Sequence, residues 1–195
     1  PQTENIGIKI GLPKAGIFYQ LLPFFKTFFQ QLGCEVIVSP TTTKSIIHAG
    51  VERVLSDTCF PVKVAYGHVD YLLKHGVDYI FFPSVVNLEP EDASQEESHL
   101  CPYIQSLPYG LDAAFELKSK LLRPVLQFRY RNLVEKALVE LGTRLGVKRP
   151  RVINAIEKGF LAQNQFESEL ETQGKMFLER NGHEFVFVLL SRPYN

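Results

Sequence analysis

The chain has 195 residues, of which 45% are hydrophobic and 22% are charged, and its formal net charge is zero. A neutral chain lacks the basic excess that is typical of proteins binding nucleic acid or anionic membranes, so we expect neither kind of partner. Its apolar runs are all shorter than the roughly 20 residues that a transmembrane helix needs. The composition is therefore that of an ordinary globular protein large enough to bury a core.

The cysteine content favours a reducing compartment. Three cysteines are present, none of them in a CxxC pair, and the polar residues 1–5 do not resemble a signal peptide. We therefore predict free thiols and a cytoplasmic location. The chain has 15 Phe and 8 Tyr but no Trp, which predicts an aromatic core or aromatic walls around a ligand.

Strand-like and helical runs alternate along the first half of the chain, which is typical of a parallel sheet with helices on both faces. The expected strands are residues 6–11, 34–38, 51–55 and 78–82, and the expected helices are residues 17–32, 44–49 and 62–75. Pro23 should either delay or kink the first helix. Gly33 should end that helix, and Gly50 should stop the second one.

The second half begins with an acidic interval, residues 89–98, which we interpret as a solvated loop. A helical stretch, residues 102–119, follows and could be split by Pro108 and Gly110. The remaining expected elements are a strand at 125–130, a helix at 132–145, a long helix at 149–180 and a buried strand at 185–190. We expect two units, residues 1–130 and residues 131–195, the second being a truncated α/β half of a longer protein.

Two cysteines occupy similar local settings. Cys59 and Cys101 each come just before an apolar helical pattern, with Pro61 and Pro102 in the expected first turn. The positive end of a helix dipole favours a thiolate, which is the form that binds metal. Asp57 or Thr58 could cap the first of these helices. The pair is therefore a candidate iron–sulfur ligand set, although two thiolates are too few for a Cys₄ cluster.

A simpler interpretation of the same cysteines is that they are small apolar residues of the core. Cys34 opens an expected core strand, so core packing is the better interpretation for this thiol. His68 could face the cysteine corner or be a hydrogen-bonded structural histidine. Lys14 lies between a strand and a helix, where phosphate sites form, but no glycine-rich fingerprint surrounds it. Further side chains could line the same cleft: Tyr103, Gln105, Tyr109 and Arg192.

Several segments together resemble the DUF2229 domain, which is found with the activase of 2-hydroxyacyl-CoA dehydratases and is similar to the dehydratase subunits. They are Pro-Lys-Ala-Gly-Ile-Phe-Tyr from residue 13, Asp-Thr-Cys-Phe-Pro-Val-Lys from residue 57, Cys-Pro-Tyr-Ile-Gln from residue 101 and Arg-Pro-Tyr-Asn from residue 192. The two cysteine segments are specific in combination, and each alone would be weak. The resemblance covers nearly the whole chain.

The resemblance implies a flavodoxin- or Rossmann-like three-layer α/β fold that holds a [4Fe–4S] or double-cubane cluster at a cleft. It implies that Cys59 and Cys101 are cluster ligands. Lys14, His68, Gln105 and Arg192 are cofactor-binding candidates from their positions in the chain, not from the resemblance. The resemblance also implies an ATP-hydrolysing activase as electron donor and a 2-hydroxyacyl-CoA thioester as the dehydratase substrate. Further cluster ligands would come from a second copy of the chain or from residues beyond Asn195, so this fragment alone should be inactive.

Two functions of different classes remain open from the sequence. The first is an iron–sulfur electron-transfer module, and the alternative is a non-catalytic module that docks a partner or a CoA-type ligand without a cluster. A cysteine-nucleophile enzyme would require a histidine close to Cys59. The cluster hypothesis predicts that Cys59 and Cys101 lie on neighbouring loops at one edge of a parallel sheet.

Overall fold

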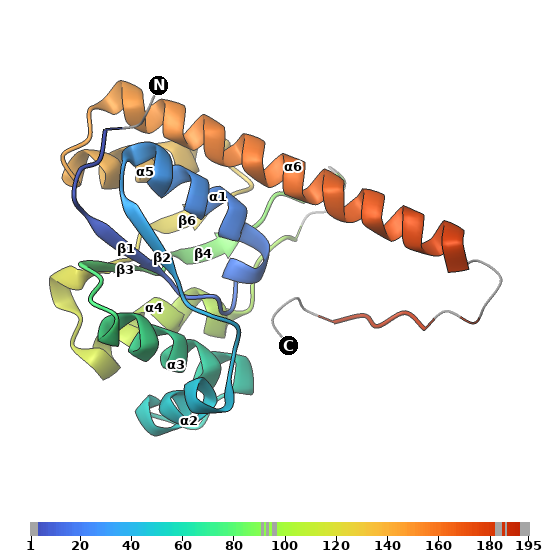
Figure 1. Ribbon diagram of the computed structural model, residues 1–195, viewed down its shortest axis with the longest axis horizontal. Coiled ribbons are helices and arrows are strands. Elements are labelled where there is room, and N and C mark those ends of the chain that lie inside the picture. Colours follow the sequence, from blue (N-terminus) through green and yellow to red (C-terminus); the bar gives the residue numbers. More distant parts are fainter. Residues whose placement is uncertain are drawn as a thin grey trace.

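A parallel sheet forms the middle layer of the protein (Figure 1). The computed structural model describes residues 4–90, 92, 94, 97–181, 185 and 187–191. Four strands are ordered β2-β1-β3-β5, and two more form a parallel pair, β4-β6. The strands are β1 (Lys9–Leu12), β2 (Glu35–Val38), β3 (Tyr79–Phe81), β4 (Ser84–Asn87), β5 (Leu121–Leu122) and β6 (Val125–Gln127). The expected α/β class is confirmed.

Helices cover both faces of this sheet, as the alternation of elements predicted. The helices are α1 (Phe18–Leu32), α2 (Lys44–Arg53), α3 (Phe60–Lys74), α4 (Pro102–Phe115), the 3₁₀ turn η1 (Lys118–Lys120), α5 (Arg131–Arg144) and α6 (Arg149–Asn181). α1 and α5 lie on one face, with α6 packed against them, and α3 and α4 lie on the other, with α2 packed on the outer side of α3 (Figure 1). The described helices include none with both the length and the apolar composition needed to cross a bilayer.

The core is largely aromatic, as the composition predicted. α1 buries five phenylalanines completely: Phe18, Phe24, Phe25, Phe28 and Phe29. Phe25 and Phe29 each lie 4.8 Å from the ring of Phe81 on β3, at inclined angles. Such edge-to-face pairs add to the apolar burial of each ring, so this cluster joins α1 firmly to the sheet. α1 runs through Pro23 and ends at Gly33, whose φ of 87° is left-handed.

Gly50 does not stop α2, contrary to the sequence prediction, and the expected strand at residues 51–55 is absent because the helix continues to Arg53. The physical reason is a close helix crossing. A Cβ at Gly50 would overlap the carbonyl oxygen of Lys63, and a Cβ at Gly67 would overlap that of Ile46. Gly50 and Gly67 are therefore contact glycines that let α2 and α3 approach backbone to backbone.

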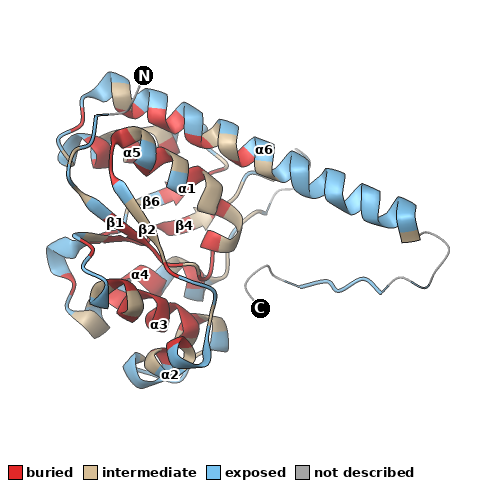
Figure 2. Cartoon of the chain, viewed as in Figure 1, coloured by how far each residue is buried: buried red, intermediate tan, exposed pale blue. Residues whose placement is uncertain are grey.

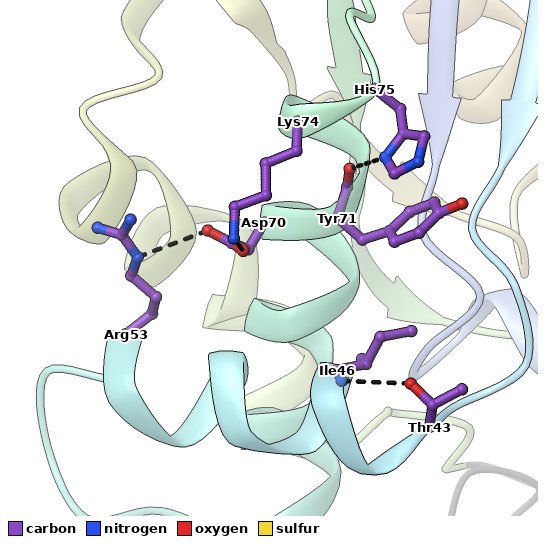
Figure 3. Close-up of polar contacts among 7 residues, drawn as sticks. All are labelled: Thr43, Ile46, Arg53, Asp70, Tyr71, Lys74 and His75. Carbon is purple, nitrogen blue, oxygen red and sulfur yellow. Dashed lines mark hydrogen bonds and ion pairs between the residues drawn. The ribbon is translucent and has the colours of Figure 1, made fainter.

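Polar contacts secure the same helix pair (Figure 3). Thr43 caps α2, accepting a hydrogen bond from the Ile46 N–H at 3.4 Å. The carboxylate of Asp70, only 8% exposed, lies 3.6 Å from the Arg53 guanidinium and 2.5 Å from the Lys74 ammonium. A buried carboxylate needs such partners, so this triad links the end of α2 to α3.

β3 ends at Phe81, two residues before Pro83, and the next strand, β4, belongs to the second sheet. Two further expectations need correction. α4 passes through Pro108 and Gly110 as one helix and then turns into η1 and β5, which the sequence did not predict. The described residues of 185–190 lie in no strand and are 75–99% exposed. Their division into a second subdomain stays a prediction.

α6 packs along the body only over its first half (Figure 2). Its buried residues end at Gln163, whose Nε2 donates to the Gln20 carbonyl at 2.9 Å. Beyond that point the helix projects from the body, and Leu170 and Phe177 are 55% and 59% exposed. The apolar spacing that faces α1 in the first half thus continues along an uncovered arm.

Candidate functional site

Cys59 and Cys101 occupy equivalent positions at the start of two helices. Each is the N-cap residue of its helix, with a non-helical backbone and a proline in the first turn. The carbonyl oxygen of Cys59 accepts from the Lys63 N–H at 3.2 Å, and that of Cys101 from the Gln105 N–H at 3.1 Å. Both thiols therefore start their helices with the same local geometry, as the sequence predicted.

The capping prediction for Asp57 and Thr58 is wrong. Asp57 instead pairs with Lys63 at 2.8 Å, and this partner lowers the pKa of its carboxyl group. The Oγ1 of Thr58 is buried without a hydrogen-bond partner in the described part of the chain. The N-cap position belongs to Cys59, which makes no side-chain capping bond, so its sulfur is not engaged by its own helix.

The packing of α3 on α4 brings the two helix starts to the same end of the sheet (Figure 1). Tyr66 of α3 lies against Gly110 of α4, where the space left by the missing Cβ admits the Tyr66 hydroxyl. Cys59 and Cys101 precede these contact residues by seven and nine positions. At 1.5 Å per residue, each lies about 10–14 Å along its own helix from this contact.

The two thiols are also accessible. Cys59 is exposed and Cys101 is half-buried, and both are free, whereas Cys34 is buried. Burial raises the pKa of the Cys34 thiol to about 11, and the nearby Arg151 opposes this only in part. The prediction that Cys34 is a core residue is confirmed, and neither of the other two sulfurs is enclosed in the core.

Large exposed apolar side chains lie within four residues of Cys59 or Cys101 in the chain. Leu55, Phe60 and Tyr103 are 67%, 57% and 58% exposed. Gln105 anchors the second corner, because its Nε2 donates to the Leu100 carbonyl at 2.6 Å. We call Leu55, Phe60 and Tyr103 the apolar rim. It is a surface suited to contact with another protein or segment.

His68 is fully buried and bonded on both ring nitrogens. Its Nδ1 lies 2.7 Å from Ser39 Oγ and its Nε2 lies 2.9 Å from Thr42 Oγ1. Burial, helped by the nearby Lys14 charge, lowers the pKa of this imidazole to about 4. A neutral histidine with two hydroxyl partners has no nitrogen left to activate Cys59, so the nucleophile interpretation lacks its base.

Sequence reasoning missed Ser39 and Thr42 as the partners of that histidine. Ser39 Oγ also accepts from the Lys14 N–H at 2.7 Å, so the network joins the loops after β1 and β2 to α3. Polar residues directly after a buried strand were the available signal. Lys14 is half-buried, and its role as a phosphate ligand stays a prediction, as do cofactor roles for His68 and Gln105. Arg192 lies outside the described residues.

The cysteine pair does not by itself complete a metal centre. Among the residues that the structure describes, no group of three or more His, Cys, Asp or Glu side chains is placed to hold a metal ion. The thiols fit the donor chemistry of an iron–sulfur cluster, but they supply only part of its ligands.

Comparison with known proteins supports the family suggested by the motifs. No curated protein and no solved structure matches the chain. The family model described as the CoA enzyme activase uncharacterised domain, DUF2229, matches residues 9–195. The match spans nearly the whole chain and includes both cysteines. The chain therefore belongs to the DUF2229 family of domains associated with CoA enzyme activases.

Proposed function

We propose that this domain is an iron–sulfur electron-transfer module of a CoA enzyme activase system, in which Cys59 and Cys101 supply two of the cluster ligands. The observation that supports it most is the pair of free N-cap cysteines at the same end of adjacent helices. Cysteine sulfurs are the usual protein ligands of cubane clusters. When bound, the cluster would accept and pass on single electrons.

The remaining ligands must come from outside the described residues, because no third metal-ligating side chain joins the two thiols there. The possible sources are a further part of the polypeptide, a second copy of the chain, or a non-protein ligand. The projecting half of α6 and the exposed apolar residues at 185 and 187–190 are consistent with a second α/β unit, residues 131–195 being its start. Such a unit would also cover the apolar rim.

The family's association with CoA enzyme activases supports an ATP-hydrolysing activase as the electron donor. The electron would then be used in the reaction of an acyl-CoA thioester, the substrate of a partner dehydratase or of the complete protein. The chain's own residues would hold the thiolates at the helix N-termini and exclude water with the apolar rim. A cytoplasmic location fits both the free thiols and this chemistry.

Anaerobic reconstitution with iron and sulfide tests the proposal on the full-length protein. Bound iron and visible charge-transfer absorption should appear in the wild type and be lost in Cys59→Ser and in Cys101→Ser. Cys34→Ala is the matched control, because this thiol is buried in the core and should not affect iron binding. A full-length protein that binds no iron, or serine variants that keep it, would exclude Cys59 and Cys101 as ligands.

A second candidate is a docking module that binds a partner protein without any cluster. The incomplete ligand set in the described residues and the exposed apolar rim favour it. In that case Phe60→Ser would weaken association with the activase, while Cys59→Ser would leave it unchanged. Loss of association both in Cys59→Ser and in wild type from which iron has been removed would instead favour the cluster.

A further inference from the structure

A solvent-open cavity of about 500 Å³ lies beside β5, at the edge of the four-stranded sheet. Its lining is mostly polar, and it includes the apolar residues Leu121 and Leu122 of β5 and Ala137 of α5. β5 and β6 are the last strands in their sheets, so no described strand covers this side. The volume falls within the range usual for small-molecule sites.

The rim of the cavity is basic in a chain whose formal net charge is zero. It presents Lys118, Arg123 and Arg144 against a single carboxylate, Glu140. Neither Lys118 nor Arg144 has an ion-pair partner within 4.0 Å among the described residues. These two cations are therefore free to meet an incoming anion.

Asp112 on α4 orients the other side of the rim. Its Oδ1 accepts from the Lys118 N–H at 2.8 Å, and its Oδ2 lies 3.5 Å from Arg123 Nη2. The Arg123 guanidinium also stacks over Tyr109, 4.8 Å from the ring centre. The Asp112 carboxylate thus fixes both the backbone of Lys118 and the guanidinium of Arg123.

The loop beneath Lys118 has an unusual backbone. Glu116 and Lys118 have φ values of 51° and 48°, a left-handed conformation that non-glycine residues rarely adopt. Such conformations persist only where surrounding contacts hold them, and they cluster at ligand sites. The contact that holds this one is the bond to Asp112, which also directs the basic rim.

We propose that this cavity binds a small organic phosphate. Arginine offers paired donors that match phosphate oxygens, and lysine adds a mobile point charge. The apolar side chains in the lining, Leu121, Leu122 and Ala137, suit contact with the ring or chain attached to the phosphate. Cys101 lies at the opposite end of α4, 14 residues long and so about 21 Å away, which separates this site from the proposed cluster ligands.

Titration of the full chain with ADP and with inorganic phosphate, followed by amide NMR shifts and calorimetry, tests the proposal. ADP should bind saturably and more tightly than phosphate alone, with shifts centred on η1, β5 and the end of α5. Lys118→Gln and Arg144→Gln should each weaken ADP about tenfold, as expected for loss of a charge-assisted hydrogen bond. The matched controls, Lys26→Gln and Arg149→Gln, remove exposed cations outside the cavity and should leave affinity unchanged.

Three results would overturn the assignment. The first is no saturation with ADP up to about 10 mM, where any useful site would be occupied. The second is an equal loss of affinity in the control variants, which would show general electrostatic attraction only. The third is binding of an extended peptide but not of ADP, which would make the open β5 edge a strand-docking surface. None of these outcomes depends on iron binding, so the proposed function is tested separately.

Discussion

The buried histidine makes a sharp prediction about pH. The folded-state pKa of His68 is about 4, well below its ordinary value of 6.5, because burial and then the nearby Lys14 charge oppose protonation. Between these pH values the unfolded chain binds a proton that the folded chain does not. The free energy of unfolding should therefore fall as the pH is lowered, and the full contribution of His68 should be present only above about pH 6.5.

The structure sets the size of this effect. One pKa unit corresponds to 1.36 kcal/mol, so the interval from 6.5 down to about 4 gives a loss of about 3 kcal/mol when the pH falls through it. This is a large fraction of the stability of an ordinary domain. Other carboxyl groups also titrate towards the acid end, so the quantity to measure is the difference between wild type and a variant without the imidazole.

Urea unfolding at pH values from 7 to 4.5, followed by circular dichroism, measures it in wild type and in His68→Gln. Glutamine does not titrate, so the variant should be less stable at pH 7 but have a shallower pH dependence. His48→Gln, at an exposed histidine with no hydrogen bond or ion pair among the described residues, is the control and should keep the wild-type slope. Equal slopes in His68→Gln and wild type, or an NMR titration of His68 near pH 6.5, would refute the reasoning.

Two further predictions concern packing and reactivity. Gly67→Ala should lower the free energy of unfolding by at least about 2 kcal/mol, because the added Cβ would overlap the Ile46 carbonyl. Gly174→Ala is the control, because nothing lies within 4 Å of the added Cβ there. Urea midpoints measure both variants, and equal midpoints would contradict the close crossing of α2 and α3. Iodoacetamide at pH 8 should alkylate Cys59 in the native protein and spare Cys34, whose pKa burial raises to about 11. Peptide mass spectrometry checks this, and equal labelling of both would disprove the burial of Cys34.

The predictions that succeeded rest on local rules. Gly33 ends α1 because glycine adopts the left-handed conformation there without strain, and Pro102 starts α4 because its missing N–H is not needed in a first turn. The aromatic core followed from the Phe-rich composition, and the free thiols from the odd cysteine count. For the candidate site, the local setting of Cys59 and Cys101 was visible in the order of residues around them.

The predictions that failed concern residues whose role is set by distant partners. The sequence predicted that Gly50 ends a helix, but the glycine is needed there because the backbone of α3 lies against it. The sequence predicted that Asp57 could cap α3, but its carboxylate instead forms an ion pair with Lys63. Residues 185–190 have the apolar pattern of a buried strand, yet the described ones are exposed because nothing in the described chain covers them.

From the sequence alone came the α/β class, the parallel sheet, the two helix-capping cysteines and the family, since hydrophobic period, proline placement and motif order are properties of neighbouring residues. Only the tertiary structure shows that the packing of α3 on α4 brings their N-termini to the same end of the sheet (Figure 1). It also shows that His68 is hydrogen-bonded to Ser39 and Thr42, and that Asp112 holds the loop carrying Lys118. The reason is that each of these contacts joins residues from different elements, and such pairings leave no periodic trace along the chain.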